Sequence, residues 1–385
     1  MRILSLTLHS LRIPFRVAFK HASAERNITQ SALVIACSET GLMGYGEGCP
    51  RDYVTGETDA SVIAFFEQHR EDLLARVTDL PTLREWCQDH EQDIDNNPAA
   101  WCALELALLD LFARHNQQPV EEMLGLPPLA GPFVYSAVLG ATDAKQFAET
   151  LARYQKIGMR DFKIKLSGDA GRDRSNLSVL RATDIVPTQV RADANNLWTD
   201  PIVAQDYLKA LDYRFAAIEE PLGPGQFADL AALGELLGTR IVLDESIARE
   251  GQLAQLPGMP ERWIINLRVS KMGGLLRSLK VMHRCRRLGL VVVVGAQVGE
   301  TSLLTRAALV VAQAGRGIVI AQEGAYGTLL LESDAVQPTL MFDAKGELDI
   351  TSLRLERSPG FGLTPIEGLA ERYFHHGTIQ EAHGD

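Results

Sequence analysis

Eight short apolar segments recur along the second half of the chain, with helix-like segments between them. In order they are FVYSAVL (133–139), DFKIKL (161–166), QVRAD (189–193), FAAIEE (215–220), TRIVLDE (239–245), WIINLRV (263–269), LVVVVGAQ (290–297) and GIVIAQE (317–323). Strands that alternate with helices predict βαβ units and a parallel sheet. Eight such units in about 190 residues favour a closed α/β barrel of the TIM type over an open doubly wound sheet.

The first third of the chain has a different pattern, typical of an α+β domain. RILSLTLHSLRI alternates apolar and polar residues as a half-buried strand does, and ALVIACSETGLMGYGEG predicts a hairpin. A strongly apolar helix should follow Asn97-Pro98, with the proline at its first position. The segment GLPPLAGP marks a domain boundary. We therefore divide the chain into an α+β domain (1–128), a barrel (129–345) and a C-terminal segment (346–385) that returns to the first domain.

Composition excludes several classes of function. The formal charge of −11 argues against a nucleic-acid partner, which requires a basic face. The five cysteines are odd in number and lack CxxC spacing, which favours free thiols over disulfides or a zinc site. The amino-terminal sequence lacks the continuous apolar core of a signal peptide, and no apolar run is long enough to span a bilayer. We expect a soluble, cytoplasmic protein with no membrane partner.

Charged residues stand at the ends of four consecutive predicted strands. Lys163 and Lys165 are separated by one residue, so both point to the same face of their strand. The next three strands end in Asp193, Glu219 and Asp244, at spacings of 26 and 25 residues. One acid per βα unit places the three carboxylates side by side at the carboxyl-terminal rim of a barrel, where active sites of this fold lie.

Three adjacent carboxylates repel one another unless a cation lies between them. Oxygen ligands with no His or Cys favour Mg²⁺ over zinc. The alternative is that each acid caps the following helix or pairs with a lysine. Beside Mg²⁺ and a second ammonium, a lysine can act as a base near neutral pH. We predict that Lys165 is this base, that Lys163 holds a ligand oxygen, and that the metal stabilises the enediolate left after an α-proton departs.

These motifs resemble the enolase superfamily, specifically its muconate lactonizing enzyme subgroup. The resemblance rests on the Lys-x-Lys strand with Asp193-Ala-Asn195, Glu219-Glu-Pro221 and Asp244-Glu-Ser246, and it extends over essentially the whole chain. It implies a (β/α)₇β barrel with an α+β capping domain, and Asp193, Glu219 and Asp244 as Mg²⁺ ligands. It also suggests a homo-oligomer.

The sixth strand, IINLRVSKMGG, departs from the family pattern. Family members that racemise or epimerise carry a second lysine at its end, and Arg268 stands there in this chain. Arginine stays protonated and its fork suits a carboxylate, so we expect Arg268 to bind an anionic substrate or an enolate. The alternative is a salt bridge to Asp244 or Glu219. Lys271 has the opposite parity, so we expect it to be structural; the alternative is that a bent strand end brings it inward.

Substrate selection in this family comes from two loops of the capping domain and from the last strands. Lys20 and Arg51 are candidates for binding a second anionic group, and Tyr53 for packing on it. Glu300 and Glu323, at the last two strand ends, are candidates for meeting an ammonium or acting as general acids; the alternative is that each caps the next helix. The predicted substrate-binding residues are therefore Lys20, Arg51, Tyr53, Asn195, Asn266, Glu300 and Glu323.

Three hypotheses for the function follow. The first is a Mg²⁺-dependent enzyme that removes a proton α to the carboxylate of a small-molecule substrate with one base, as a cycloisomerase or a β-eliminating lyase. The second adds reprotonation on the other face, which gives an N-acylamino acid racemase or a dipeptide epimerase. The third is a metal-binding barrel without catalysis, although such a protein has no need of paired lysines.

Overall fold

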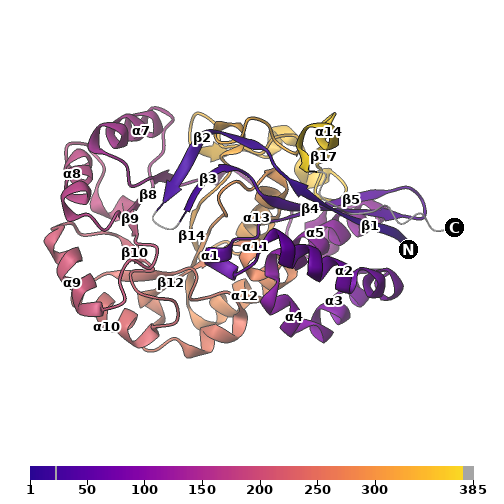
Figure 1. Ribbon diagram of the computed structural model, residues 1–385, viewed down its shortest axis with the longest axis horizontal. Coiled ribbons are helices and arrows are strands. Elements are labelled where there is room, and N and C mark those ends of the chain that lie inside the picture. Colours follow the sequence, from indigo (N-terminus) through magenta and orange to yellow (C-terminus); the bar gives the residue numbers. More distant parts are fainter. Residues whose placement is uncertain (22–23, 376–385) are drawn as a thin grey trace.

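A computed structural model describes residues 1–21 and 24–375 of the chain (Figure 1). Its largest sheet has eight parallel strands in the order β14-β13-β12-β11-β10-β9-β8-β7. The sheet curls until its edges meet, where Ser136 N donates to Gln322 O at 2.7 Å and Gln322 Nε2 donates to Val134 O at 3.3 Å. The predicted TIM-type barrel with a capping domain is confirmed.

The barrel strands match the eight apolar segments. They are β7 (Ala137–Leu139), β8 (Phe162–Lys165), β9 (Val190–Asp193), β10 (Ala217–Glu219), β11 (Arg240–Leu243), β12 (Trp263–Leu267), β13 (Val291–Val294) and β14 (Val319–Gln322). The helices between them are α7 (Ala144–Lys156), α8 (Ala170–Arg181), α9 (Pro201–Ala210), α10 (Phe227–Leu237), α11 (Val269–Met272), α12 (Leu275–Leu288) and α13 (Ser302–Ala314). Between β11 and β12 the chain forms 3₁₀ turns, η2 (Glu250–Gln255) and η3 (Pro260–Arg262), since the prolines and glycines of this stretch disfavour a longer helix.

The capping domain joins an antiparallel sheet to a layer of helices. Its strands are β1 (Ile3–Leu11), β2 (Pro14–His21), β3 (Ala24–Ile28), β4 (Ser31–Ser38) and β5 (Met43–Gly48). Its helices are α1 (Asp52–Thr55), α2 (Asp59–Arg76), α3 (Leu80–Asp89), α4 (Glu91–Asn96), α5 (Pro98–His115) and α6 (Val120–Met123). The β2–β3 hairpin lies over the barrel (Figure 1), because β2 begins against the segment that follows β14, where Phe15 forms a bridge with Leu331.

The part of the chain that follows β14 contacts both domains. Its elements are η4 (Gly327–Leu329), β15 (Val336–Gln337), β16 (Glu347–Leu348), η5 (Thr351–Leu353), η6 (Leu355–Arg357), β17 (Thr364–Pro365), α14 (Leu369–Tyr373) and β18 (Phe374–His375). The short strand β6 (Phe133–Val134) precedes the barrel strands. Strand β16 pairs with β6 beside the barrel, and β18 then pairs with β1 of the cap. The chain therefore ties the cap to the barrel a second time.

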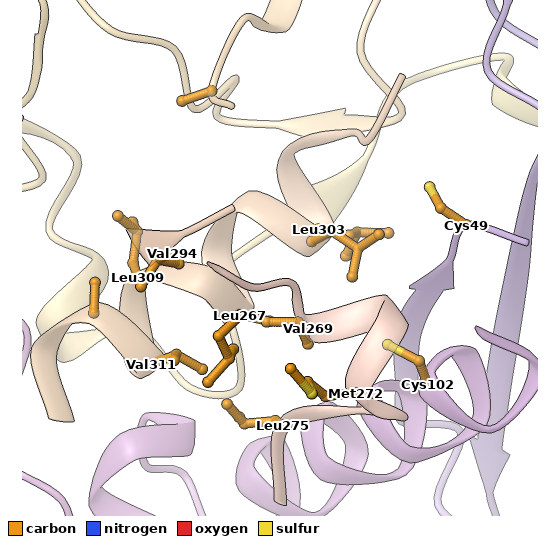
Figure 2. Packing of buried hydrophobic residues seen from close by; sticks show 14 of the residues in the cluster. Cys49, Cys102, Leu267, Val269, Met272, Leu275, Val294, Leu303, Leu309 and Val311 are labelled. Atoms are coloured by element: carbon orange, nitrogen blue, oxygen red, sulfur yellow. The ribbon is translucent and has the colours of Figure 1, made fainter. Parts of the chain in front are cut away.

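The buried core continues from the barrel into the cap. Figure 2 shows Met272 of α11 next to Cys102 of α5, with Val269 and Leu267 on the side of Met272 away from Cys102. Short helix α11, which follows β12, is therefore held between the two domains. No helix in the described part of the chain is both long and apolar enough to cross a membrane.

The closest contact within the cap depends on glycine. Gly44, Gly46 and Gly48 alternate along β5 and face the backbone of α5. A Cβ atom on Gly46 would lie 2.1 Å from Ala103 O and 2.3 Å from Ala107 N, closer than real Cβ contacts. The sequence GYGEG is therefore required for the strand to lie directly on the helix.

We predict that Gly46→Ala lowers the free energy of unfolding by about 3 kcal/mol, because backbone atoms on both sides must shift. Gly251→Ala is the matched control, since its added Cβ would meet nothing within 4 Å. Urea denaturation of the three proteins measures both changes. Equal midpoints for Gly46→Ala and the wild type would contradict the close packing of β5 on α5.

Candidate active site

The barrel interior is apolar at one level and charged at the next. Ala217, Val242, Ile264 and Val293 form a small apolar cluster of their own inside the barrel. Because strand side chains alternate, residues two positions further along face inward as well. Glu219, Asp244 and Asn266 occupy such positions, and each is no more than 1% exposed. The sheet register aligns Glu219 with Asp193, and Asp193 with Lys165. The predicted rim residues therefore lie side by side.

Two lysines face the carboxylates as the sequence pattern predicted. Lys165 Nζ lies 3.0 Å from Asp193 Oδ2 and donates to Asn195 Oδ1 at 2.7 Å. Lys163 Nζ lies 3.3 Å from both carboxylate oxygens of Glu219 and 3.3 Å from Asp193 Oδ2. Asn195, at a left-handed φ of 45°, therefore orients the Lys165 ammonium from the loop after β9.

The charges in this cluster shift one another's pKa values. Burial alone would raise the pKa of Asp193, but the Lys165 and Lys163 ammoniums hold it below its usual range. Burial also opposes the charged form of Lys163, yet Glu219, Glu323 and Asp193 raise the pKa of its ammonium. Lys163 is therefore a permanently charged group in this site.

Glu220, which sequence analysis did not single out, shapes the turn that carries Asp244. Its backbone has a left-handed φ of 36°. Its carboxylate accepts hydrogen bonds from Asp244 N at 2.7 Å, Ser246 N at 2.8 Å and Ser246 Oγ at 2.9 Å. The sequence IEEP contained a signal for this role. Neighbouring strand residues point to opposite faces, so Glu220 cannot share the inward position of Glu219.

Arg268 and Lys271 both contact Asp244. Arg268 Nη2 forms an ion pair with Asp244 Oδ2, as the alternative to substrate binding anticipated, and Arg268 Nη1 donates to Gln297 Oε1 at 2.9 Å. Lys271 Nζ donates to Asp244 Oδ1 and to Asn266 O, each at 2.8 Å, and to Asp244 O. Burial and Arg268 lower the pKa of Lys271 to about 7, although the carboxyl groups of Glu245, Glu220 and Glu219 oppose this shift. Strand parity did not locate Lys271, because α11 begins at Val269.

Glu323 belongs to a buried ion network rather than to a free substrate contact. It lies 2.7 Å from Lys163 Nζ through one oxygen and 2.7 Å from Arg191 Nη1 through the other. Arg191 also reaches Asp161 and Ser136, each at 2.9 Å. These cations outweigh burial and lower the pKa of Glu323 to about 2, which corrects the expectation that it acts as a general acid.

Arg51 is not at the surface. This corrects the expectation that Arg51 binds a second anionic group of the substrate. It is fully buried, and its guanidinium donates to the backbone oxygens of Gln30, Pro50, Thr29 and Val298 at 2.6 to 3.1 Å. A charged side chain on a short loop can be buried when backbone carbonyl oxygens accept hydrogen bonds from its N–H groups. Arg51 therefore connects the cap to the barrel loop after β13.

Glu47 makes a second connection to this loop. Its carboxylate accepts from Thr301 N at 3.1 Å and Thr301 Oγ1 at 2.6 Å, next to the start of α13. Cys49 N donates to Ser270 Oγ of α11 at 2.8 Å. The segment 47–51 of the cap therefore positions both the loop 297–301 and the helix that follows Arg268.

The remaining substrate-binding candidates differ in their surroundings. Asn266 Nδ2 donates to Glu219 Oε1 at 2.9 Å, and Gln297 N donates to Glu300 Oε1 at 2.6 Å. Burial raises the pKa of Glu300 to about 8, so its neutral form predominates at neutral pH. Tyr53 stacks beneath the Arg26 guanidinium at 5.6 Å. The side chain of Lys20 lies outside the described part of the structure.

The three carboxylates have the donor chemistry that Mg²⁺ requires. Within residues 1–21 and 24–375, no three His, Cys, Asp or Glu side chains converge on one point in this conformation, since each acid turns toward a cationic side chain. All three are nonetheless buried oxygen donors on neighbouring strand ends. Such a set fits a hard divalent cation.

A barrel with this cap and this ring of carboxylates and lysines defines the class of enolase-type proteins. The chain matches "Enolase C-terminal domain-like" over residues 146–368 and "Mandelate racemase / muconate lactonizing enzyme, N-terminal domain" over residues 5–125. The protein belongs to the mandelate racemase/muconate lactonizing enzyme family of the enolase superfamily, as its motifs predicted.

Its relatives of similar length are enzymes. A hydrophobic dipeptide epimerase of Enterococcus faecalis is 26% identical over 91% of this chain and 97% of its own length. An N-succinyl-L-Arg/Lys racemase of Bacillus cereus is 24% identical over 94% of this chain and 95% of its own. The structure of a muconate lactonizing enzyme from Pseudomonas fluorescens superposes with a TM-score of 0.83, at 22% identity and 97% and 99% coverage. The last similarity concerns the fold alone.

We predict that Arg51→Met destabilises the protein by about 3 kcal/mol, because it leaves buried carbonyl groups without donors. Arg286→Met is the matched control: Arg286 also donates to two backbone oxygens, of Ala314 and Arg316, but at an exposed position where water can replace it. Thermal and urea unfolding measure both. Unchanged stability of Arg51→Met would favour the original assignment of Arg51 to substrate binding.

Proposed function

We propose that the protein is a Mg²⁺-dependent enzyme that removes a proton α to the carboxylate of a small-molecule substrate, with Lys165 as the base. The observation that carries the proposal is the adjacent placement of Lys163 and Lys165 with Asp193, Glu219 and Asp244 at the strand ends. Mg²⁺ held by the three carboxylates would bind the substrate carboxylate and stabilise the negative charge that develops when the proton leaves.

The residues around the lysines have distinct roles in this proposal. Asn195 and Asp193 fix the Nζ atom of Lys165 at the rim, so that its nitrogen can accept a proton from one face of a substrate. Lys163 stays protonated and offers its ammonium to an oxygen of the substrate carboxylate. Glu323, held by Arg191, keeps Lys163 in position.

Arg268 favours one-base chemistry. It directly follows β12, where a second base would stand, and a guanidinium does not give up its proton in proteins. With a base on one face and a cation on the other, cycloisomerisation or β-elimination is the overall reaction that we favour. Arg268 would then bind an anionic group or an oxygen of the substrate.

A second candidate is racemisation or epimerisation. It is supported by the relatives, which include a hydrophobic dipeptide epimerase and an N-succinyl-L-Arg/Lys racemase that align along nearly the whole chain. This reaction needs a proton donor on the face opposite Lys165. Both candidates share the first half-reaction, so one experiment can address them together.

Proton NMR in D₂O with Mg²⁺ tests the shared half-reaction on pools of N-acyl amino acids, dipeptides, muconates and hydroxy acids. We predict loss of an α-proton signal with the wild type and at least a 10³-fold slower loss with Lys165→Ala, since a general base contributes about 10²–10⁴-fold. Lys209→Ala, on the exposed face of α9, is the control. Equal exchange in Lys165→Ala would exclude Lys165 as the base.

The stereochemical course separates the two candidates. We predict that the wild type gives an olefin or a lactone without inversion, and that Arg268→Lys gains exchange with formation of the opposite enantiomer, because lysine can donate and accept a proton there. Chiral chromatography of the products measures this. Inversion by the wild type that is lost in Arg268→Ala would establish epimerisation and make Arg268 essential to it.

A further inference from the structure

Two buried nitrogen donors at the mouth of the barrel have no hydrogen-bond partner. They are Nε of Arg268 and Nε2 of Gln297, on side chains that already contact each other through Nη1 and Oε1 at 2.9 Å. Arg268 is 8% exposed and Gln297 is 3% exposed. An unpaired buried donor is unfavourable, and two of them on adjacent side chains suggest that an acceptor belongs between them.

Contacts place both side chains beside the candidate metal ligand Asp244, because Arg268 pairs with Asp244 and Gln297 contacts Arg268. Arg268 directly follows the end of β12, and Gln297 lies in the loop after β13. Gly295 leaves the room that this requires: a Cβ there would lie 2.0 Å from Asn266 Oδ1 and 3.2 Å from Arg268 Cγ. Any larger residue at 295 would displace the Asn266 amide and crowd the Arg268 side chain.

The negative charge next to Arg268 comes from one carboxylate that it shares with Lys271. Among the described residues, Asp244 is the one carboxylate within ion-pair distance of Arg268, and Asp244 also holds Lys271. Glu300 lies nearby, but its pKa of about 8 leaves it largely neutral at pH 7. A divalent cation on Asp244 would add further positive charge. An anionic acceptor therefore fits this position better than a neutral carbonyl.

We propose that Arg268 and Gln297 form a subsite for a second carboxylate of the substrate, so that the substrate class is a small acid with two carboxylate groups. This inference rests on the proposed function, in which the first carboxylate is the one next to the reacting carbon. Arg268 supplies the charge and Gln297 supplies a fixed second donor. The cap holds the subsite in place, because Arg51 and Glu47 form hydrogen bonds with the loop that carries Gln297.

The test compares binding of paired probes to the Mg²⁺-loaded protein by isothermal titration calorimetry. The dicarboxylates malonate, succinate, glutarate and adipate are each paired with the monocarboxylate of equal chain length. We expect the best dicarboxylate to bind at least tenfold more tightly than its partner. In Gln297→Leu and in Arg268→Met this ratio should fall to below threefold. Because the ratio is taken within one variant, a loss of folded protein lowers both signals alike.

Gln313→Leu is the matched control. Gln313 is a buried glutamine at the carboxyl-terminal end of α13, and its Oε1 accepts a hydrogen bond from Ala130 N. It should retain the wild-type ratio. A ratio that persists in both Gln297→Leu and Arg268→Met, or a wild-type ratio near one, would overturn the subsite. The proposed function is judged separately by α-proton exchange, which depends on Lys165: exchange without a dicarboxylate preference rejects the subsite alone, and the reverse rejects the proposed chemistry alone.

Discussion

The site depends on mutual compensation of buried charges inside the barrel. Asp193, Glu219 and Asp244 are each 1% exposed, and none of them could be held there as a carboxylate without a cation close by. Lys163 and Lys165 provide that compensation from the adjacent strand, while Arg268 and Lys271 provide it from the other side. Burying a cluster of charges lowers the stability of the fold. The same charged groups are the ones that the proposed reaction uses.

The cap contributes to this arrangement at a distance from the reacting groups. Gly46 and its neighbours let β5 lie on α5, and the end of β5 then delivers Glu47, Cys49 and Arg51 to the barrel. These contacts hold the loop after β13 and helix α11, which flank Arg268. Both domains therefore set the geometry at the mouth of the barrel. A change in the packing of the cap would shift the residues where substrate would bind.

Much of this was readable from the sequence because strand parity is a strict rule. The Lys-x-Lys repeat and the regular spacing of the three acids placed the rim residues, and the structure puts them side by side. Residues beyond the strand ends followed no such rule. The parity of Lys271 is uninformative because Lys271 lies on a helix. The burial of Arg51 cannot be predicted, because a loop position does not reveal four inward-facing carbonyl groups. The ion pair of Glu323 cannot be predicted either, because its partner Arg191 lies on a strand distant in sequence.

The central claim is that the three strand-end carboxylates hold one divalent cation. Electron paramagnetic resonance of Mn²⁺, used in place of Mg²⁺, counts bound ions directly. The account predicts one bound Mn²⁺ per chain in the wild type, loss of at least tenfold in affinity in Asp244→Asn, and no change in Asp334→Asn, where another buried aspartate caps main-chain groups. Equal Mn²⁺ binding by Asp244→Asn and the wild type would contradict the account, since the carboxylates would then serve only to balance the lysines.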